Sequence, residues 1–188
     1  MPETIATTTP ELSPLRKDLW QQYKHFWKPL SVPAKTLLLK EGEVSCRAYF
    51  ITQGGVRVWF NSNGKEVSFQ FFFEGEGVSS FDSFFKSIPS VFSIETLEPC
   101  RLFYLHKDDY EQMVAEAPFI KDVILEAAVE RMTNYTRHFL SVIKDTPAQR
   151  YRKLLEERPY LLQRVAPAYV ASYLGISPAS LNRMRNKA

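Results

Sequence analysis

The sequence predicts an α+β chain in which a jelly-roll barrel precedes a long helix and a small helical region at the C-terminal end. Six of the seven glycines fall between Gly42 and Gly77, where they separate short runs of β-branched and aromatic residues, as in a small β-barrel. Neither Gly nor Pro occurs from Phe119 to Thr146, which favours one long helix. Two short helical patterns flank Gly175, an arrangement typical of a helix-turn-helix.

The predicted strands are six runs of residues that favour extended backbone, at 37–39, 49–52, 56–60, 67–73, 91–94 and 102–105. Turn-forming residues separate neighbouring runs at Gly54-Gly55 and from Asn61 to Gly64. Short helical patterns occur at 79–85 and 107–115. Residues 34–116 should therefore form a double-stranded β-helix, or jelly roll, although a fold does not by itself define a function.

Residues 1–33 are expected to form an N-terminal tail and a helix. Between positions 12 and 27, Leu15, Leu19, Tyr23 and Phe26 recur at helical spacing, and two prolines follow. Because proline breaks helices, this helix should end there and pack against the next domain.

A dimerisation helix is predicted over residues 117–145, with Pro118 in its first turn. Its apolar residues step alternately by three and four, which is the spacing of a coiled-coil seam. The seam consists of Leu125, Ala128, Met132, Tyr135, Phe139 and Val142. A buried helix of a monomer would show the same stripe, but a long helix between two domains favours a parallel homodimer.

Residues 146–188 are predicted to form a small helix-turn-helix domain. One helix spans 168–174 and ends at Gly175. Ser177 can cap a second helix that starts with Pro178 and turns Leu181 and Met184 inward. The alternative is an ordinary helix pair with a solvated basic face.

Positive charge is concentrated in this last segment. From position 147 onward the chain contains eight Lys or Arg residues and two Glu, which gives a net charge of +6. Since the whole chain is +3, the preceding residues carry −3. A cationic end on a mildly acidic body is the pattern expected of a protein that binds a phosphate backbone, although basic ends also serve solubility.

Other classes of protein find little support. No apolar run is long enough to span a membrane, and the first residues lack the features of a secretion signal, so we expect a cytoplasmic protein without a membrane partner. Cys46 and Cys100 form no metal-ligand pattern with the three histidines and should be buried free thiols. No nucleophile motif, facing carboxylate pair or phosphate-binding loop occurs, so we expect neither an enzyme nor a metal site.

Several motifs resemble those of the Crp/Fnr family of bacterial transcription regulators. They are Lys40-Glu-Gly-Glu43, Tyr49-Phe-Ile-Thr-Gln-Gly-Gly-Val-Arg-Val58, Glu74-Gly-Glu-Gly77, Pro118 and Tyr169-Val-Ala-Ser-Tyr-Leu-Gly-Ile-Ser-Pro-Ala-Ser-Leu-Asn-Arg183. The resemblance covers the chain from about position 34 to its end. It implies a cyclic-nucleotide-binding type of roll, a dimer helix and a DNA-binding helix-turn-helix, with RNA polymerase as a further candidate partner.

The residues argue against ordinary cyclic AMP binding. In nucleotide-binding members a Gly-Glu pair holds the ribose and a downstream arginine holds the phosphate. Here Val78 follows Gly77, and the place of the arginine falls near Ser90. No arginine lies between Arg57 and Arg101, so a phosphate would lack a bidentate donor. The N-terminal cysteine cluster of the oxygen-sensing members is also absent.

No cofactor is therefore assigned, and the effector, if one exists, is an unidentified small molecule. Candidate pocket residues are Gly77, Ser79, Ser80, Ser83, Ser90, Tyr135 and Thr136. Solvated loop serines and a core tyrosine would explain the same residues without a ligand.

The leading interpretation is a homodimeric regulator that binds double-stranded DNA. Its candidate DNA-binding residues are Ser177, Ala179, Ser180, Arg183, Arg185 and Lys187, with Arg183 matching the family's recognition arginine. Too few residues follow Lys187 for the β-hairpin wing that the resemblance implies, so we expect few phosphate contacts and strong salt dependence. The alternatives are a small-molecule sensor that signals through protein partners and a constitutive regulator whose roll binds nothing.

Overall fold

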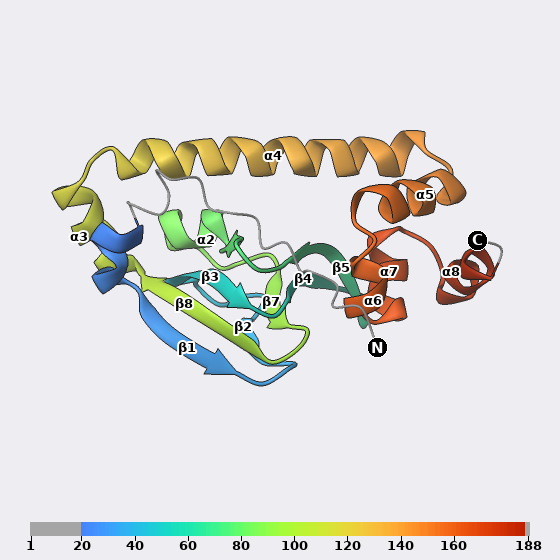
Figure 1. Ribbon diagram of the computed structural model, residues 1–188, viewed down its shortest axis with the longest axis horizontal. Coiled ribbons are helices and arrows are strands. Elements are labelled where there is room, and N and C mark those ends of the chain that lie inside the picture. The colour runs from blue at the N-terminus through green and yellow to red at the C-terminus, as the bar shows by residue number, and fades with distance from the viewer. Residues whose placement is uncertain (1–19, 187–188) are drawn as a thin grey trace, which may run out of the picture. The chain divides into compact units, whose positions relative to one another are not determined.

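Two four-stranded sheets make up the roll in the computed structural model, which describes residues 20–186 (Figure 1). The strands are β1 (Lys28–Val32), β2 (Leu37–Leu39), β3 (Arg47–Gln53), β4 (Val56–Ser62), β5 (Lys65–Phe72), β6 (Gly77–Val78), β7 (Ser93–Thr96) and β8 (Cys100–His106). One sheet has the order β1-β8-β3-β6 and the other β2-β7-β4-β5. In the first, β8 pairs antiparallel with both neighbours, so that Leu102 lies opposite Leu30 on one side and Ile51 on the other.

Apolar side chains from both sheets fill the interior of the roll. Ile51 and Ile94 are completely buried, and Leu102 and Phe71 nearly so. The turn between β3 and β4 requires a glycine at position 54, where φ is +100°. A Cβ there would lie only 2.6 Å from the Cys100 sulfur, so the close packing of the predicted Gly-Gly turn leaves no room for a larger residue.

The helices are η1 (Lys24–Phe26), α2 (Phe81–Lys86), α3 (Lys107–Glu116), α4 (Ile120–Lys144), α5 (Pro147–Glu157), α6 (Leu161–Arg164), α7 (Pro167–Tyr173) and α8 (Pro178–Arg185). A β-roll, one long helix and small C-terminal helices thus follow one another along the chain, which confirms the predicted α+β fold (Figure 1).

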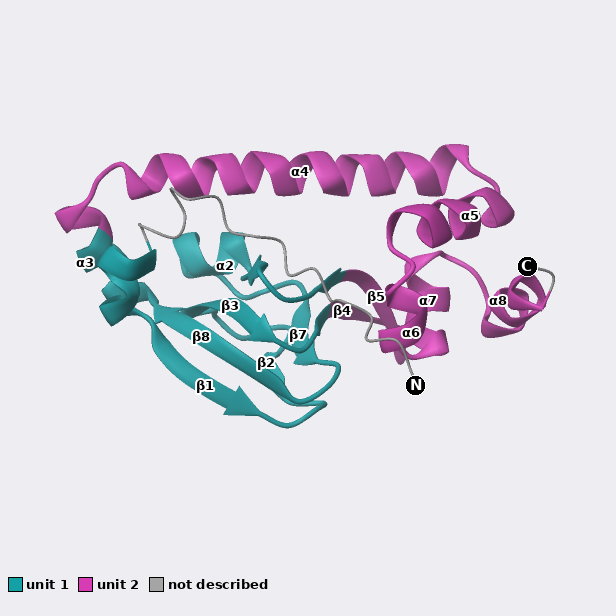
Figure 2. Ribbon diagram, in the orientation of Figure 1, with its two compact units in different colours: residues 1–57, 71–113 teal, residues 58–70, 114–188 magenta. Residues whose placement is uncertain are grey.

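Contacts divide the chain into two units within the β4–β5 hairpin (Figure 2). The first unit contains residues up to Arg57 together with Phe71–Met113, and the second contains Val58–Gln70 and Val114 onward. The distal part of the hairpin therefore belongs with α4 to α8. A hydrogen bond supports this grouping, because the backbone N–H of Ser68 in β5 donates to the Ser172 hydroxyl in α7 at 3.0 Å. The predicted domain boundaries stay predictions.

Two strands were not predicted. β1 contains Pro29, which we expected to end a helix. It is an edge strand of its sheet, the position where a proline is tolerated because no ladder hydrogen bond is lost. β6 is only two residues long and includes Gly77, so it left no periodic signal. Of the predicted N-terminal helix, residues 20–23 are helical and the preceding part lies outside the described residues. Trp20 packs on Phe103, with ring centroids 4.8 Å apart.

The prediction of two buried thiols is wrong for one of them. Cys46 is exposed at the start of β3, whereas Cys100 is buried inside the roll. Burial raises the pKa of the Cys100 thiol to about 11, which keeps it protonated. Among residues 20–186, no helix combines the length and apolar composition needed to cross a membrane, and no group of three or more His, Cys, Asp or Glu side chains could hold a metal.

Candidate nucleic-acid interface and serine cluster

The last helix, α8, begins as the sequence predicts. Ser177 is its N-cap, and its hydroxyl accepts a hydrogen bond from the Ser180 backbone N–H at 3.2 Å. Pro178 takes the first helical position, where a missing N–H costs nothing. Leu181 is 1% exposed and anchors the helix, while Met184 is half-buried.

The turn before α8 depends on Gly175. Its φ of +64° is left-handed, a conformation that a glycine adopts without strain. The N–H of Ile176 donates to the Ala171 carbonyl at 3.0 Å and closes the end of α7. Because Val170, Ala171 and Leu174 are buried, α7 and α8 pack together around a small apolar core. This is the predicted two-helix arrangement.

Most of the predicted DNA-binding residues lie on the outer surface of α8. Ala179, Arg183 and Arg185 are exposed, and Ser180 is half-buried. Arg183 is held by its own helix, since Nη2 donates to the Ser180 hydroxyl at 3.2 Å. That hydroxyl also lies 2.9 Å from the Ser177 hydroxyl. Lys187, the sixth predicted residue, lies outside the described part of the chain.

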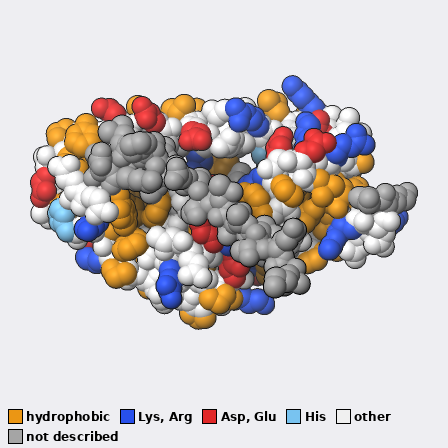
Figure 3. Space-filling model, viewed as in Figure 1, with side chains coloured by type: hydrophobic (Ala, Val, Ile, Leu, Met, Phe, Trp, Pro, Cys, Tyr) orange, Lys and Arg blue, Asp and Glu red, His pale blue; other side chains and the backbone are white. Residues whose placement is uncertain are grey.

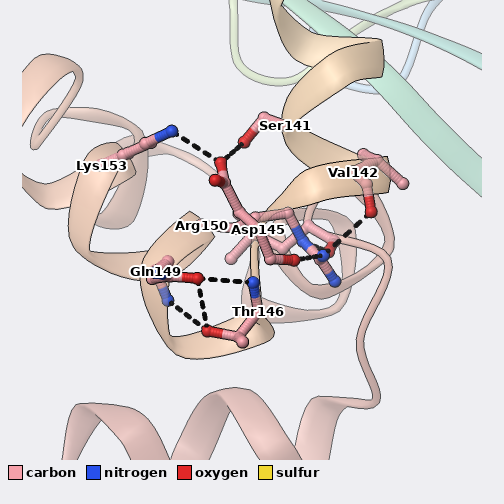
Figure 4. Close-up of polar contacts among 8 residues, drawn as sticks. Ser141, Val142, Asp145, Thr146, Gln149, Arg150 and Lys153 are labelled. Atoms are coloured by element: carbon pink, nitrogen blue, oxygen red, sulfur yellow. Dashed lines mark hydrogen bonds and ion pairs between the residues drawn. The ribbon is translucent and has the colours of Figure 1, made fainter.

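Arg150 has a different role from the one its charge suggested. We counted it among the basic residues of the C-terminal segment, but it is only 9% exposed. Its Nε donates to the Leu174 carbonyl at 2.8 Å. Its Nη1 donates to the carbonyls of Asp145 at 2.7 Å and Val142 at 3.2 Å (Figure 4). One guanidinium thus joins the end of α4 to the end of α7. Sequence reasoning missed this because the three carbonyls carry no side-chain signal.

The junction between α4 and α5 is a dense polar cluster (Figure 4). Thr146 and Gln149 form a capping box, with the Thr146 N–H donating to Gln149 Oε1 at 2.8 Å. The Asp145 carboxylate accepts from Lys153 Nζ at 2.6 Å and from the Ser141 hydroxyl. These hydrogen bonds, that from Lys153 first, lower the pKa of Asp145 and keep it ionised.

The remaining basic residues of α5 to α8 are on or near the surface (Figure 3). Arg152, Lys153, Arg183 and Arg185 are exposed, while Arg158 and Arg164 are half-buried. With Arg150 buried, six arginines and lysines among the described residues of this segment are accessible, at least in part, to a phosphate backbone.

The predicted seam of α4 is largely exposed in the single chain. Leu125 is 62% exposed, Met132 63% and Phe139 63%. Tyr135 and Val142 are also exposed, and Ala128 is half-buried. Ile143, beside the seam, is 62% exposed. In the single chain this helix therefore leaves a large apolar stripe uncovered, a feature typical of an interaction surface.

Three of the predicted pocket serines are brought together inside the first unit. Ser80, Ser83 and Ser90 are each at most 4% exposed. The Ser90 hydroxyl bonds to the Ser80 hydroxyl at 2.9 Å and to the Phe92 carbonyl at 2.8 Å. The Ser83 hydroxyl accepts from the Ser45 N–H at 2.7 Å. These hydroxyls, the serine cluster, are thus used within the roll.

The other candidate pocket residues are placed less tightly. Ser79 donates a long hydrogen bond, 3.4 Å, to the Arg47 carbonyl, and Gly77 lies in β6. Tyr135 and Thr136 lie on α4 in the second unit, where the Thr136 hydroxyl donates to the Met132 carbonyl at 2.9 Å.

The buried arginine of the roll is already paired with a carboxylate. The buried Arg57 forms an ion pair with Glu95 on the neighbouring strand β7. No arginine follows it until Arg101 on β8. Among the described residues, the hydroxyls of the serine cluster bond to no cationic side chain, which is the kind of donor that holds a cyclic phosphate most strongly.

The comparisons with known proteins agree with this geometry. The family model of the cyclic nucleotide-binding domain matches residues 29–117, the part of the chain that contains the roll. A comparison with curated protein sequences gave no match. The chain is therefore a protein with a cyclic-nucleotide-binding type of roll followed by a helical C-terminal region.

Solved structures show which known proteins share this fold. The c-di-GMP-responsive global regulator CLP of Xanthomonas campestris is similar with a TM-score of 0.74 and 18% identity over 91% of this chain and 90% of that one. FixK2 of Bradyrhizobium japonicum is similar with a TM-score of 0.73 and 15% identity over 86% of this chain and 83% of that one. The catabolite activator protein of Thermus thermophilus is similar with a TM-score of 0.55 and 19% identity over 95% of this chain and 84% of that one. The chain has the Crp/Fnr fold, and the resemblance seen in its motifs is confirmed.

Proposed function

We propose that this protein is a dimeric, DNA-binding transcription regulator of the Crp/Fnr type. The observation that carries the proposal is the position of Arg183, which projects from the exposed face of α8 in a helix-turn-helix. In such motifs the second helix enters the major groove and its side chains contact base edges. An arginine in that place can donate two hydrogen bonds to guanine.

The neighbouring residues suit the supporting contacts. Ala179 lies on the exposed surface and can approach bases closely, whereas Ser177, Ser180 and Arg185 flank it and are placed for phosphates. Lys187, which follows the described residues, would add a cation. Exposed Arg152 and Lys153 on α5 extend the positive charge beyond α8. Together they would supply the non-specific part of the affinity.

The proposed dimer would form along α4. Its exposed seam of Leu125, Met132 and Phe139 has the heptad spacing of a parallel helix pair. A symmetric dimer presents two copies of α8, which fits two half-sites about 34–36 Å apart on one face of the duplex.

We further propose that the roll does not bind cyclic AMP in the usual way. Ser90 lies near the position where the family's phosphate-holding arginine is expected, and its hydroxyl is already bonded to the Ser80 hydroxyl and the Phe92 carbonyl. Addition of cyclic AMP should therefore leave the melting temperature unchanged. A rise that depends on cyclic AMP concentration would overturn this part of the proposal.

Selection from a pool of random duplexes by the purified protein tests the main proposal. We expect an inverted repeat to be enriched, with affinity falling steeply between about 50 and about 200 mM salt. If the protein enriches no sequence, while a small molecule or a protein partner stabilises it, the alternative sensor function without DNA would be supported instead.

A further inference from the structure

The exposed surface of α8 carries a carboxamide that the sequence-based prediction left out. Successive residues of a helix are separated by about 100° around its axis. Leu181, which is 1% exposed, and the half-buried Met184 mark the inner side of α8. Ala179, Asn182, Arg183 and Asn186 then fall on the opposite side, and all four are exposed. This set, the outer face of α8, shares Ala179 and Arg183 with the predicted set and adds two asparagines, whereas the other predicted residues flank it or lie outside the described residues.

Asn182 and Arg183 are placed differently on this face. Arg183 is tied to Ser180 by a hydrogen bond of 3.2 Å. The carboxamide of Asn182 makes no hydrogen bond within residues 20–186, and its side chain is exposed. An unpaired amide beside the proposed guanine-reading arginine has both its donor and its acceptor available to a ligand.

We propose that Asn182 reads an adenine in the major groove, at a base pair next to the one that Arg183 reads. Adenine presents N7 as an acceptor and the N6 amino group as a donor, and an asparagine side chain matches both at once. Guanine presents two acceptors in the same place, so it would leave the amide oxygen facing another oxygen. This inference rests on the proposed DNA-binding function and gives that function a base preference.

Asn186 has the same chemistry but a different place. It is the C-cap of α8, one turn beyond Asn182 and therefore farther from the N-terminal end of the helix, where base contacts concentrate in such motifs. Asn186 is therefore assigned to the backbone rather than to a base, and it serves as the matched control. Both side chains are exposed amides on the same helix, so loss of either should leave the fold intact.

Parallel selections from random duplexes with the wild-type protein, Asn182→Ala, Asn182→Asp and Asn186→Ala test the proposal. The wild type should enrich an adenine at one position of each half-site, and changing that adenine should weaken binding about 5- to 150-fold. Asn182→Ala should lose the preference at that position alone and keep the guanine preference. Asn182→Asp, which has the same shape, should exchange adenine for cytosine, because a carboxylate accepts from the cytosine N4 amino group.

The possible outcomes distinguish a failure of this inference from a failure of the proposed DNA-binding function. If all four proteins select the same sequence, Asn182 does not read a base and the inference is overturned, while the proposed function stands. If Asn186→Ala loses the adenine instead, the assignment within α8 is wrong. If the wild type itself enriches no duplex, the proposed function fails and the inference fails with it. Circular dichroism of each variant shows that a lost preference is not a lost fold.

Discussion

The Nε of Arg150 donates a 2.8 Å hydrogen bond to the carbonyl of Leu174, which joins α5 to the end of α7. The same guanidinium also binds two carbonyls at the end of α4. A single buried cation therefore links the end of α7 to both α4 and α5. Since the three carbonyls belong to backbone, their geometry is fixed by the helices and not by side-chain rotation.

Replacement of Arg150 by Met should lower the free energy of unfolding by about 2–4 kcal/mol, because the carbonyls lose a charged donor in a buried place. Lysine should recover only part of this loss, since it lacks the planar fork of donors. Urea denaturation measures the effect. Arg152→Met on the exposed side of the same helix is the control, and it should change stability by less than about 0.5 kcal/mol. Equal losses in the two variants would contradict the role of Arg150.

Loss of the capping box should weaken α5. Thr146→Ala removes a hydroxyl that accepts from the Gln149 N–H at 3.4 Å, and it should cost about 1 kcal/mol in unfolding free energy. Thr133→Ala is the matched control, because the Thr133 hydroxyl only bonds to the Val129 carbonyl within α4 and caps nothing. If Thr133→Ala destabilises as much as Thr146→Ala, the cap is not what the hydroxyl provides.

Stability should fall at mildly acidic pH through His138. Its ring stacks on Tyr173 of α7, with centroids 4.2 Å apart. Burial, followed by the nearby charges of Arg150 and Arg158, lowers the pKa of His138 below its usual value of 6.5. The unfolded chain therefore takes up the proton first, so stability is fully present above about 6.5 and declines as the pH falls toward the folded pKa.

His138→Phe keeps a ring beside Tyr173 but cannot titrate. Comparison of its unfolding free energy with that of the wild type at about pH 7.5 and about pH 5.5 should show a smaller drop for the variant. Asp145 does not confuse the comparison, because its lowered pKa places its own titration below 3.8. Identical pH profiles for the two proteins would show that His138 is not desolvated.

DNA binding should depend on the paired hydrogen bonds that Arg183 can donate, and not on its positive charge alone. Arg183→Ala should cost about 1–3 kcal/mol of binding free energy on a selected duplex and relax the preference at one base pair. Arg183→Lys keeps the charge but loses the bidentate contact, so it should relax the same base pair. Arg185→Ala, on the flank of α8, should weaken all duplexes alike and reduce the salt slope by about 1. A selected site bound equally well by Arg183→Ala would show that this arginine makes no base contact.

A charge in the exposed seam of α4 should separate the proposed dimer. Phe139→Glu places a carboxylate on each copy where the two helices would meet, and light scattering should then report a single chain. Glu130→Gln, an exposed charge outside the seam on the same helix, should leave the mass unchanged. If Phe139→Glu remains a dimer, the seam lies elsewhere.

The sequence predicted correctly those elements whose boundaries depend on the backbone preferences of neighbouring residues. Ser177, Pro178 and Gly175 define the start of α8 and the preceding turn through their own backbone preferences, and the structure places each as expected. Glycine spacing likewise indicated the strands of the roll. Pro29 misled us because its meaning depends on whether the strand that contains it is an edge, which no local pattern reveals.

Long-range contacts explain what the sequence could not predict. Arg150 and Leu174 are 24 residues apart, and Ser68 and Ser172 are 104 apart. Each pair includes a backbone atom, so no complementary side chains point to it. Asn182, the proposed adenine-reading residue, was left out for a different reason, because its exposure depends on which side of α8 is buried. The helical spacing of Leu181 and Met184 already contained that information.

The number of chains on one selected duplex tests the central claim most directly. Light scattering of the complex, on a duplex that carries both halves of the selected site, should give a mass of two chains per duplex. Half-sites about 10–10.5 base pairs apart should be required for that stoichiometry. A complex with one chain per duplex, unchanged when one half-site is scrambled, would contradict the account.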